Sequence, residues 1–594
     1  MPPFGFKPLD GGFAACALVC ALAGPATASS LQVIYPGSGH TTDADRISII
    51  GTASPDGVVT VNGRAVQRSP AGHFAPVVPL KLGRNVIVLR HGAETLRLVV
   101  DRVPDEPLPA PDGAFAPGSI SPGSMEWRMP GESIRLSAIA PPGAQVAAHW
   151  KGRTIPMLPE SPVTLPGNKA GLIDRNEPRL HPDVTRYVGT LVLGGPTAAS
   201  PPSFTLDGHG RHAIATAPGA IGVIDPARLP VVRVTSDSGV ARIGPSTDYA
   251  RLTPLPAGTT SAVTGRDGDW LRLSYGGWIR QQETARVEAP PPETTVRSVI
   301  ATSTDRWTEL RVPMEAAVPV TVDQPDGEFV LTLHGAVSQT DIARCEPDGL
   351  VDRLDMRPAG PTTTRFAFKL KRPYAWGYRL RYQGTTLVLD LHHWPLRAPG
   401  GPLAGMTIVL DPGHGGSDTG TSGPTGWHEK AQTLIEALLV RDELARRGAH
   451  VVMTRDQDRD VSLADRDALI ERVAPDLSVS LHYNALPDGG DCGHTEGVAG
   501  FWYNPQSHDL AMDLQEYLVD TLHRPSYGIY WDNLALTRPA VAPAVLMELG
   551  FMTHPWEFEW ITDESANRKL AIAIADGLQR WWDAVTEPPA SPTR

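Results

Sequence analysis

Four ionisable residues in the last third of the chain are of types that act together in metal-dependent hydrolysis. His414 lies in a glycine-rich turn after one short apolar run, His482 ends a second run, and Glu548 stands within a third. Glu429 opens a stretch whose apolar residues recur at helical spacing. Two histidines and one carboxylate, with a fourth position left for water, form a ligand set used for catalytic zinc. A further carboxylate beside such a metal is placed to act as a general base.

The elements around these residues predict that they converge. The runs 408–411, 477–482 and 544–551 are apolar and rich in β-branched residues, which is typical of buried parallel strands. Open α/β sheets bind ligands beyond the carboxyl ends of their strands, so side chains at these ends share one edge. The helix predicted over 429–447 ends at Gly448 and would start at that edge.

Each residue also has an ordinary structural role. The glycines around His414 could serve only to form a tight turn, and His482 could be a buried histidine with one hydrogen-bond partner. Glu429 is an acidic residue favourable in the first turn of a helix, and Glu548 could belong to an ion pair. His428 is adjacent to Glu429 and is the better zinc ligand by residue type, so the residues alone leave both open. The joint occurrence of all four at strand ends and a helix start favours a site.

The order of the motifs resembles the zinc-dependent N-acetylmuramoyl-L-alanine amidases of bacterial cell walls. The resemblance covers about residues 405–585 and implies that His414, Glu429 and His482 bind Zn²⁺ and that Glu548 is catalytic. It favours Glu429 over His428, because only Glu429 aligns with the Glu-Lys pair of the family. The motifs are Asp-Pro-Gly-His-Gly-Gly at 411–416, Glu-Lys at 429–430, Arg455 with Asp458, Ser-Leu-His-Tyr-Asn at 480–484, and Glu-Leu-Gly-Phe at 548–551.

The implied activity is hydrolysis of the amide bond between N-acetylmuramic acid and L-alanine in peptidoglycan. Two rivals are a degenerate member that binds peptidoglycan without cutting it, and an adhesive scaffold whose β modules carry the function. Some amidases of this family hold an inserted helix over the zinc site, after the helix predicted here at 507–522. The next strand region already begins at residue 529, which leaves no room for such a helix and predicts an open site.

Composition limits the remaining functions. A chain of 594 residues with 41% hydrophobic content should contain several packed domains. The net charge of -12, with no dense basic run, excludes nucleic acid as a partner. Cys16 and Cys20 lie in an apolar N-terminal run, so a disulfide framework is excluded, and a single bridge between Cys345 and Cys492 stays open.

The N-terminus predicts export. Residues 11–24 are apolar and small, and Ala-Thr-Ala at 26–28 fits a cleavage site, so 1–28 is predicted to be a signal peptide. No other stretch is long and apolar enough to be predicted as a transmembrane helix. We therefore expect an exported protein, with the periplasm as the first expectation and a secreted or wall-associated enzyme as the alternative.

The whole chain contains 58 prolines and 58 glycines. The sequence before residue 400 predicts mainly short strands and turns. We expect N-terminal all-β modules, both sandwiches and a small barrel, followed by a C-terminal α/β domain with a mainly parallel sheet. Trp270 and Trp278 either pack the interior of the barrel, which is the more ordinary role, or contact a ligand.

Envelope or division proteins are candidate partners of the β modules. The predicted boundaries are an immunoglobulin-like sandwich at 29–103, a linker at 104–130, a second sandwich at 131–229, a barrel resembling bacterial Src-homology-3 modules at 230–288, an envelope-targeting sandwich at 289–394, a linker at 395–404 and the zinc amidase domain at 405–588.

Overall fold

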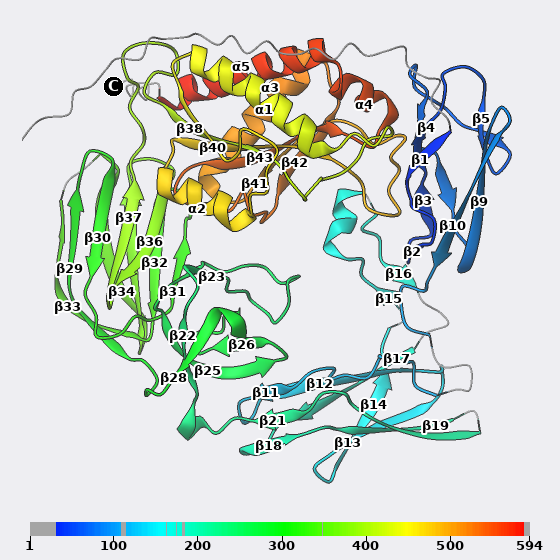
Figure 1. Ribbon diagram of the computed structural model, residues 1–594. Helices are drawn as coiled ribbons and strands as arrows, with labels where there is room; N and C mark the ends of the chain where they lie inside the picture. The colour runs from blue at the N-terminus through cyan, green and yellow to red at the C-terminus, as the bar shows by residue number, and fades with distance from the viewer. Residues whose placement is uncertain are drawn as a thin grey trace, which may run out of the picture.

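The computed structural model describes residues 31–108, 114–161, 163–173, 175–180, 185–208, 210–346 and 349–586 (Figure 1). The predicted signal peptide and the cysteines in it lie outside these ranges. Within them, no helix combines the length and the apolar character needed to cross a bilayer. The prediction of a mostly β N-terminal region followed by an α/β domain is confirmed.

The first module packs short sheets around a core that includes Ile47, Phe74 and Leu89. Its longest pair, β9 and β10, is antiparallel. Its strands are β1 Gln32–Tyr35, β2 His40–Thr42, β3 Arg46–Ser48, β4 Ile50–Thr52, β5 Val59–Val61, β6 Arg64–Ala65, β7 His73–Phe74, β8 Val77–Pro79, β9 Gly83–His91 and β10 Glu94–Arg102.

The next part of the chain forms a six-stranded sheet, β12-β17-β14-β13-β19-β20, over a core around Leu136 and Phe204. Residues 163–173 and 175–180, which together are called the segment 163–180 below, lie between β14 and β17 in the sequence and carry the short helix η1. The elements are β12 Ser133–Ala140, β13 Gln145–Trp150, β14 Arg153–Pro159, β15 Val163–Thr164, η1 Asn168–Leu172, β16 Arg179–Leu180, β17 Thr185–Val192, β19 Ser203–Gly208 and β20 Arg211–Thr216.

A second sheet, β18-β21-β11-β25-β22-β28 with β26 and β27, continues across residues 230–288. Strand β11 pairs with β25, so the end of the stretch predicted as a linker at 104–130 belongs to this sheet. Trp270 and Trp278 are both buried here. The elements are β11 Glu126–Arg128, β18 Thr197–Ser200, β21 Ile221–Val223, η2 Pro226–Arg228, β22 Val231–Val234, β23 Ser238–Gly239, β24 Leu255–Pro256, β25 Thr260–Asp267, β26 Trp270–Leu273, β27 Trp278–Arg280, η3 Gln281–Glu283 and β28 Thr284–Val287.

Two sheets, β33-β29-β30-β37-β36 and β31-β32-β35-β34, enclose the next core, with Phe329, Phe366 and Leu389 inside. The side chain of Trp376, between β35 and β36 of this module, packs against Trp581 and Trp582 of the last helix of the chain. The strands are β29 Thr294–Ser303, β30 Trp307–Val312, β31 Val320–Asp323, β32 Glu328–His334, β33 Ala336–Cys345, β34 Val351–Gly360, β35 Thr363–Leu370, β36 Gly377–Gln383 and β37 Thr386–His392.

The C-terminal domain holds one six-stranded sheet in the order β39-β38-β40-β43-β41-β42. The first four strands are parallel, and β41 is antiparallel to β43. Helices α1, α3 and α5 bury one face of the sheet, whereas α2 covers part of the other (Figure 1). The elements are β38 Thr407–Pro412, α1 Glu429–Arg446, β39 His450–Met453, α2 Leu463–Val473, β40 Leu477–Asn484, β41 Val498–Trp502, η4 Pro505–Ser507, α3 His508–Leu522, β42 Ser526–Trp531, β43 Ala544–Phe551, α4 Pro555–Ile561 and α5 Glu564–Thr586.

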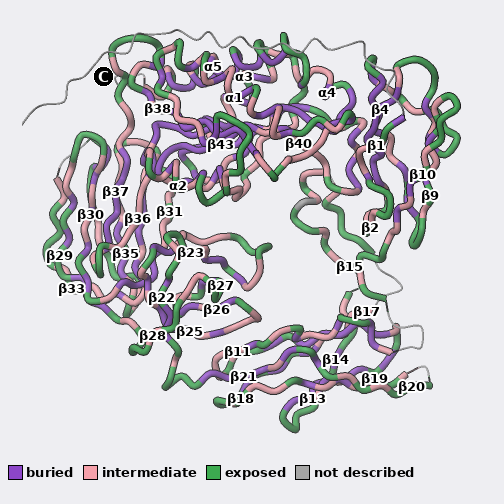
Figure 2. The backbone as a smooth tube through the Cα atoms, in the orientation of Figure 1, coloured by how far each residue is buried: buried purple, intermediate pink, exposed green. Residues whose placement is uncertain are grey.

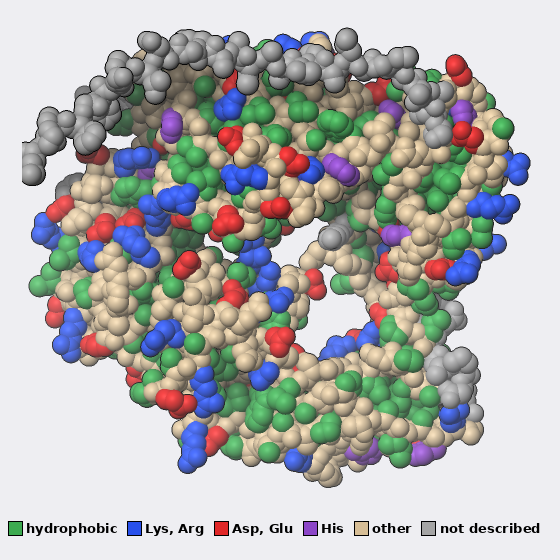
Figure 3. Space-filling model, viewed as in Figure 1, with side chains coloured by type: hydrophobic (Ala, Val, Ile, Leu, Met, Phe, Trp, Pro, Cys, Tyr) green, Lys and Arg blue, Asp and Glu red, His purple; other side chains and the backbone are tan. Residues whose placement is uncertain are grey.

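The first module returns to the C-terminal domain and docks on the loop after β40. Asp488 accepts hydrogen bonds from Tyr35 Oη and from His40 Nε2 at 2.8 Å, and Arg46 Nε donates to the Gly489 carbonyl at 2.7 Å. Residues are buried both at this contact and in the central sheet of the C-terminal domain (Figure 2). The modules therefore surround an opening, which the space-filling view shows directly (Figure 3).

Candidate metal centre

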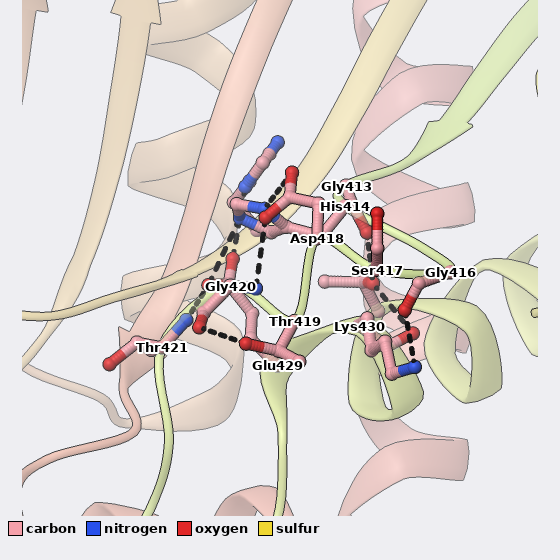
Figure 4. A network of polar contacts seen from close by, with 12 residues as sticks. Gly413, His414, Gly416, Ser417, Asp418, Thr419, Gly420, Thr421, Glu429 and Lys430 are labelled. Carbon is pink, nitrogen blue, oxygen red and sulfur yellow. Dashed lines mark hydrogen bonds and ion pairs between the residues drawn. The ribbon is translucent and has the colours of Figure 1, made fainter. Parts of the chain in front are cut away.

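The three predicted ligand residues converge at one edge of the sheet. His414 follows β38 in a left-handed conformation with φ of 60°, Glu429 is the first residue of α1, and His482 lies near the end of β40. One ligand atom from each lies within 4.8 Å of the other two. Figure 4 shows His414 and Glu429 facing each other across the turn that joins their elements.

Glu429 is the centre of this cluster. Its carboxylate oxygens lie 3.1 Å from His414 Nε2 and 3.0 Å from His482 Nδ1, and they accept hydrogen bonds from the backbone N–H groups of Thr421 and Tyr483. The side chain is only 4% exposed. Although burial opposes ionisation, the hydrogen bonds from both histidines lower the pKa of Glu429 to about 2. The cluster therefore holds a buried carboxylate at neutral pH.

His414 is oriented from both sides of its ring. Its Nδ1 lies 2.9 Å from Asp418 Oδ2, so Nε2 is left facing Glu429. Burial lowers the pKa of this imidazole, but Glu429 and Asp418 together raise it to about 9. A carboxylate on the far nitrogen of a histidine is the usual arrangement behind a metal ligand, because it fixes the ring and its tautomer.

The donor set and the space around it fit Zn²⁺. Two imidazole nitrogens and one carboxylate oxygen, close together and facing one point, leave a tetrahedral ion one open position. Two glycines make this approach possible. A Cβ on Gly420 would lie 2.5 Å from Glu429 Oε2, and one on Gly413 would lie 2.3 Å from His482 Cε1. Side chains at either position would push the donors apart.

Glu548 lies beside the cluster and not within it. It is the register partner of His482 across the parallel strands β40 and β43. Its Oε2 is buried without a hydrogen-bond partner among the described residues. Burial, and then the charge of Glu429, raise the pKa of Glu548 well above its usual range. An unsatisfied buried carboxyl of this kind is suited to hold and release a proton.

His428 does not join the site. It is exposed at the N-cap of α1, and its Nδ1 lies 2.9 Å from Ser422 Oγ. The structure therefore brings together Glu429, and not its neighbour, with the two histidines. A cavity of about 420 Å³ opens beside the cluster. It is lined by Asp411, Gly413, His414, Gly415, Asp418, Asp460, Val461, Ser462, Leu463, Arg466, His482 and Leu536.

A buried ionic network supports the turn that carries His414. Asp411 is paired with Arg466 of α2 and accepts a hydrogen bond from Ser480 Oγ at 2.5 Å. Arg466 also donates to the carbonyl of His414 at 2.6 Å. Arg466 was missed in the sequence, because one arginine in a polar helix carries no sign that its side chain turns inward.

Arg455 explains one of the sequence motifs. It is fully buried and donates to the carbonyls of Pro412, Gly413 and Lys430. It therefore ties the end of β38 to the start of α1, the two elements that carry His414 and Glu429. Asp458 accepts from the backbone of Gly416 and holds the same turn from outside.

Residues 408–580 match the family described as N-acetylmuramoyl-L-alanine amidase. The chain is 36% identical over 185 residues to a probable cell wall amidase, LytH, of Staphylococcus epidermidis. The aligned residues cover 31% of this chain and 60% of that protein. LytH of Staphylococcus aureus matches at the same identity and coverage. The chain thus spans 60% of the length of these curated relatives.

Among solved structures, an N-acetylmuramoyl-L-alanine amidase from Clostridium difficile 630 is 32% identical and covers 30% of this chain and 97% of its own, with a TM-score of 0.29. The amidase AmiC2 of Nostoc punctiforme is 27% identical and covers 30% and 99%, also with a TM-score of 0.29.

Proposed function

Because residues 408–580 belong to the N-acetylmuramoyl-L-alanine amidase family, we propose that this protein is a zinc-dependent hydrolase of the amide bond between N-acetylmuramic acid and L-alanine in peptidoglycan. The observation that supports it most is the grouping of His414, Glu429 and His482 beside the unpartnered carboxyl of Glu548. These four residues separate into a donor set and one free acid–base group, which amide hydrolysis requires.

The roles follow from the positions. His414 Nε2, His482 Nδ1 and the Glu429 carboxylate would hold Zn²⁺, which when bound polarises the amide carbonyl and lowers the pKa of water towards about 7. Asp418 keeps the ring of His414 in place. The positive charge of a bound Zn²⁺ would favour the ionised form of Glu548. In that form, Glu548 takes a proton from the attacking water and passes it to the amine nitrogen of L-alanine as the C–N bond breaks. The products are a free stem peptide and a glycan strand with a lactyl carboxylate.

The remaining modules would place this reaction in the cell envelope. We propose export through the signal peptide 1–28 to the periplasm, and attachment or partner binding through the β modules at 29–103, 131–229, 230–288 and 289–394. The docking of the first module on the loop after β40 supports a role for it close to the catalytic domain.

The full chain should release stem peptides with free L-alanine amino groups from purified sacculi. A chelator should stop the release, and added Zn²⁺ should restore it. If zinc-loaded protein binds sacculi yet releases no peptide, the protein is a peptidoglycan-binding scaffold and the proposed activity is wrong.

A further inference from the structure

The sheet face that carries His482 and Glu548 also carries an apolar patch, formed by Ala499, Phe501 and Leu546. Side chains alternate along a strand, so Leu546 lies on the same face as Glu548, two residues away. Ala499 is the register partner of Glu548, and Phe501 is that of Leu546. The patch therefore begins directly beside Glu548, on the side away from His482.

One residue from the N-terminal half of the chain packs against this patch. Leu172, the last residue of η1, packs against the patch together with Tyr527, Tyr530 and Leu534. Figure 1 shows η1 beneath the sheet near β41 and β42, far from the rest of the module to which it belongs.

The segment 163–180 is held there by a few polar contacts. Arg175 pairs with Asp45 of the first module at 2.8 Å and reaches the carbonyl of Gly489 at 3.5 Å. Asn168 Nδ2 donates to the carbonyl of Asp248 at 3.4 Å. Contacts of this kind between exposed groups contribute little, commonly about 0–1 kcal/mol each.

The segment has little structure of its own to hold it in place. Its strands β15 and β16 contain two residues each. Val163, Leu165 and Leu180 are 46%, 80% and 65% exposed, so they form no local core. Segments with few buried contacts open at low free energy while the rest of the fold stays intact. Packing of the partly buried Leu172 against the patch and the two hydrogen bonds from Arg175 to Asp45 are thus the contacts that keep this segment on the sheet.

A polymeric substrate that extends past Glu548 along the sheet would reach the surface that Leu172 occupies. Its scissile bond has to lie between the donor cluster and Glu548, and the chain then continues in both directions. On one side it meets the cavity of about 420 Å³, and on the other side it meets the patch. A short soluble fragment can use the cavity alone, whereas an uncut glycan with its peptides extends over both.

We propose that the patch of Ala499, Phe501 and Leu546 is a substrate-binding subsite and that Leu172 occupies it as a competitor built into the same chain. This inference rests on the proposed amidase function. Binding of the polymer and seating of Leu172 exclude each other, so the segment 163–180 makes the enzyme slow on intact peptidoglycan until the segment leaves.

Removing the competitor should raise activity. Leu172→Asp should increase kcat/KM on sacculi about tenfold, since burial of one leucine is worth roughly that shift in an equilibrium. Hydrolysis of a soluble muramoyl peptide should change less than twofold. Leu165→Asp is the matched control, because Leu165 lies in the same segment and is exposed, and it should leave both rates unchanged.

Fixing the competitor in place should have the opposite effect. In a Cys345→Ser/Cys492→Ala background, Leu172→Cys with Ala499→Cys should form a disulfide under oxidant and lose activity on sacculi, which a reductant should restore. Ala499→Cys alone should show no response to oxidant. If Leu172→Asp lowers the rate, or if the oxidised double variant stays fully active on sacculi, the segment is a wall of the site and the inference is overturned.

A readout without catalysis separates this inference from the proposed function. In the same background, on protein without the predicted signal peptide that carries Cys16 and Cys20, and with Glu548→Gln, sacculi should speed thiol labelling of Leu172→Cys several-fold, because bound polymer keeps the segment off the sheet. Unchanged labelling in the presence of bound sacculi would overturn the inference even if the wild type cleaves. Faster labelling with no cleavage by the zinc-loaded wild type would support the subsite and reject the amidase function.

Discussion

His482 and Glu548 are register partners on two adjacent parallel strands. One side chain belongs to the cluster of His414, Glu429 and His482, and the other stays outside it, with a buried Oε2 that has no hydrogen-bond partner among the described residues. The spacing between neighbouring strands, about 4.8 Å, sets the distance between their backbones. The sheet itself thus holds the Glu548 carboxyl beside this cluster without adding it to the cluster.

Replacing Glu548 should separate chemistry from metal binding. Glu548→Gln keeps the shape of the side chain but cannot take a proton from water. It should retain stoichiometric zinc and lose about 100- to 10,000-fold in kcat on sacculi. Elemental analysis and peptide-release rates measure the two effects. Glu564→Gln, at an exposed helix end, is the control. Turnover close to that of wild type would remove Glu548 from the mechanism.

Replacing the histidines should test the donor set. His414→Ala removes one of three donors and leaves Glu429 with one imidazole partner, so zinc should be lost during dialysis. His428→Ala, which changes the exposed histidine adjacent to Glu429, should keep its zinc. Zinc content after dialysis, with circular dichroism to show an intact fold, decides the matter. Equal zinc in both variants would contradict the assignment.

Replacing Arg466 should destabilise the C-terminal domain. Asp411 is fully buried, and Arg466→Met would leave its charge with hydroxyl partners only. Removal of one partner of a buried pair costs about 3–5 kcal/mol, so the urea midpoint should fall sharply. Arg441→Met, at an exposed ion pair, should change it by less than about 1 kcal/mol. Adding Asp411→Asn to Arg466→Met should restore part of the lost stability, because it removes the unpaired buried charge. Strictly additive losses of stability from the two changes would argue against the buried pair.

Glu126 should make stability fall with rising pH. Burial, and then Asp267, raise the pKa of Glu126 from 4.5 to about 7, against the effect of Arg128. A raised folded-state pKa contributes stability below the unfolded value that is lost as pH rises through about 7. Glu126→Gln should therefore match the wild type in Tm at pH 4.5 and exceed it at pH 8.

Glu132 provides the opposite control. Although burial opposes it, the hydrogen bond from Arg272 lowers the pKa of Glu132. Its contribution to stability is present above pH 4.5 and is lost as pH falls through the lowered value, so Glu132→Gln should be less stable than the wild type at pH 8. Identical pH courses of Tm for the wild type and Glu126→Gln would show that folding does not shift the pKa of Glu126.

The donor cluster was predictable because it depends on local patterns. His414 follows a strand, His482 lies near the end of one, and Glu429 opens a helix. The apolar spacing and the glycine turns of the sequence predict the boundaries of those elements. The choice of Glu429 over His428 needed the family resemblance. Composition and periodicity likewise separated the β region from the α/β domain.

The surroundings of the site were not predictable, because they depend on contacts between distant segments. The packing of Leu172 against the patch that includes Phe501 joins parts of the chain more than 300 positions apart, and no periodicity indicates such a contact. The prediction of an open site considered only insertions within the catalytic domain. It stays a prediction, and the structure adds that a residue of another module packs against the patch beside Glu548.

The contact between Tyr35 and Asp488 also implies an order of assembly. These residues are 453 positions apart, so at about 5–20 residues per second roughly 20 to 90 s pass between their syntheses. During that time the first module exists without its partner loop, and Ile50 and Ala75, which later pack with Cys492, face solvent. The catalytic domain is synthesised last, after the module that docks on it. Completion of the active face is therefore among the latest events in the maturation of the chain.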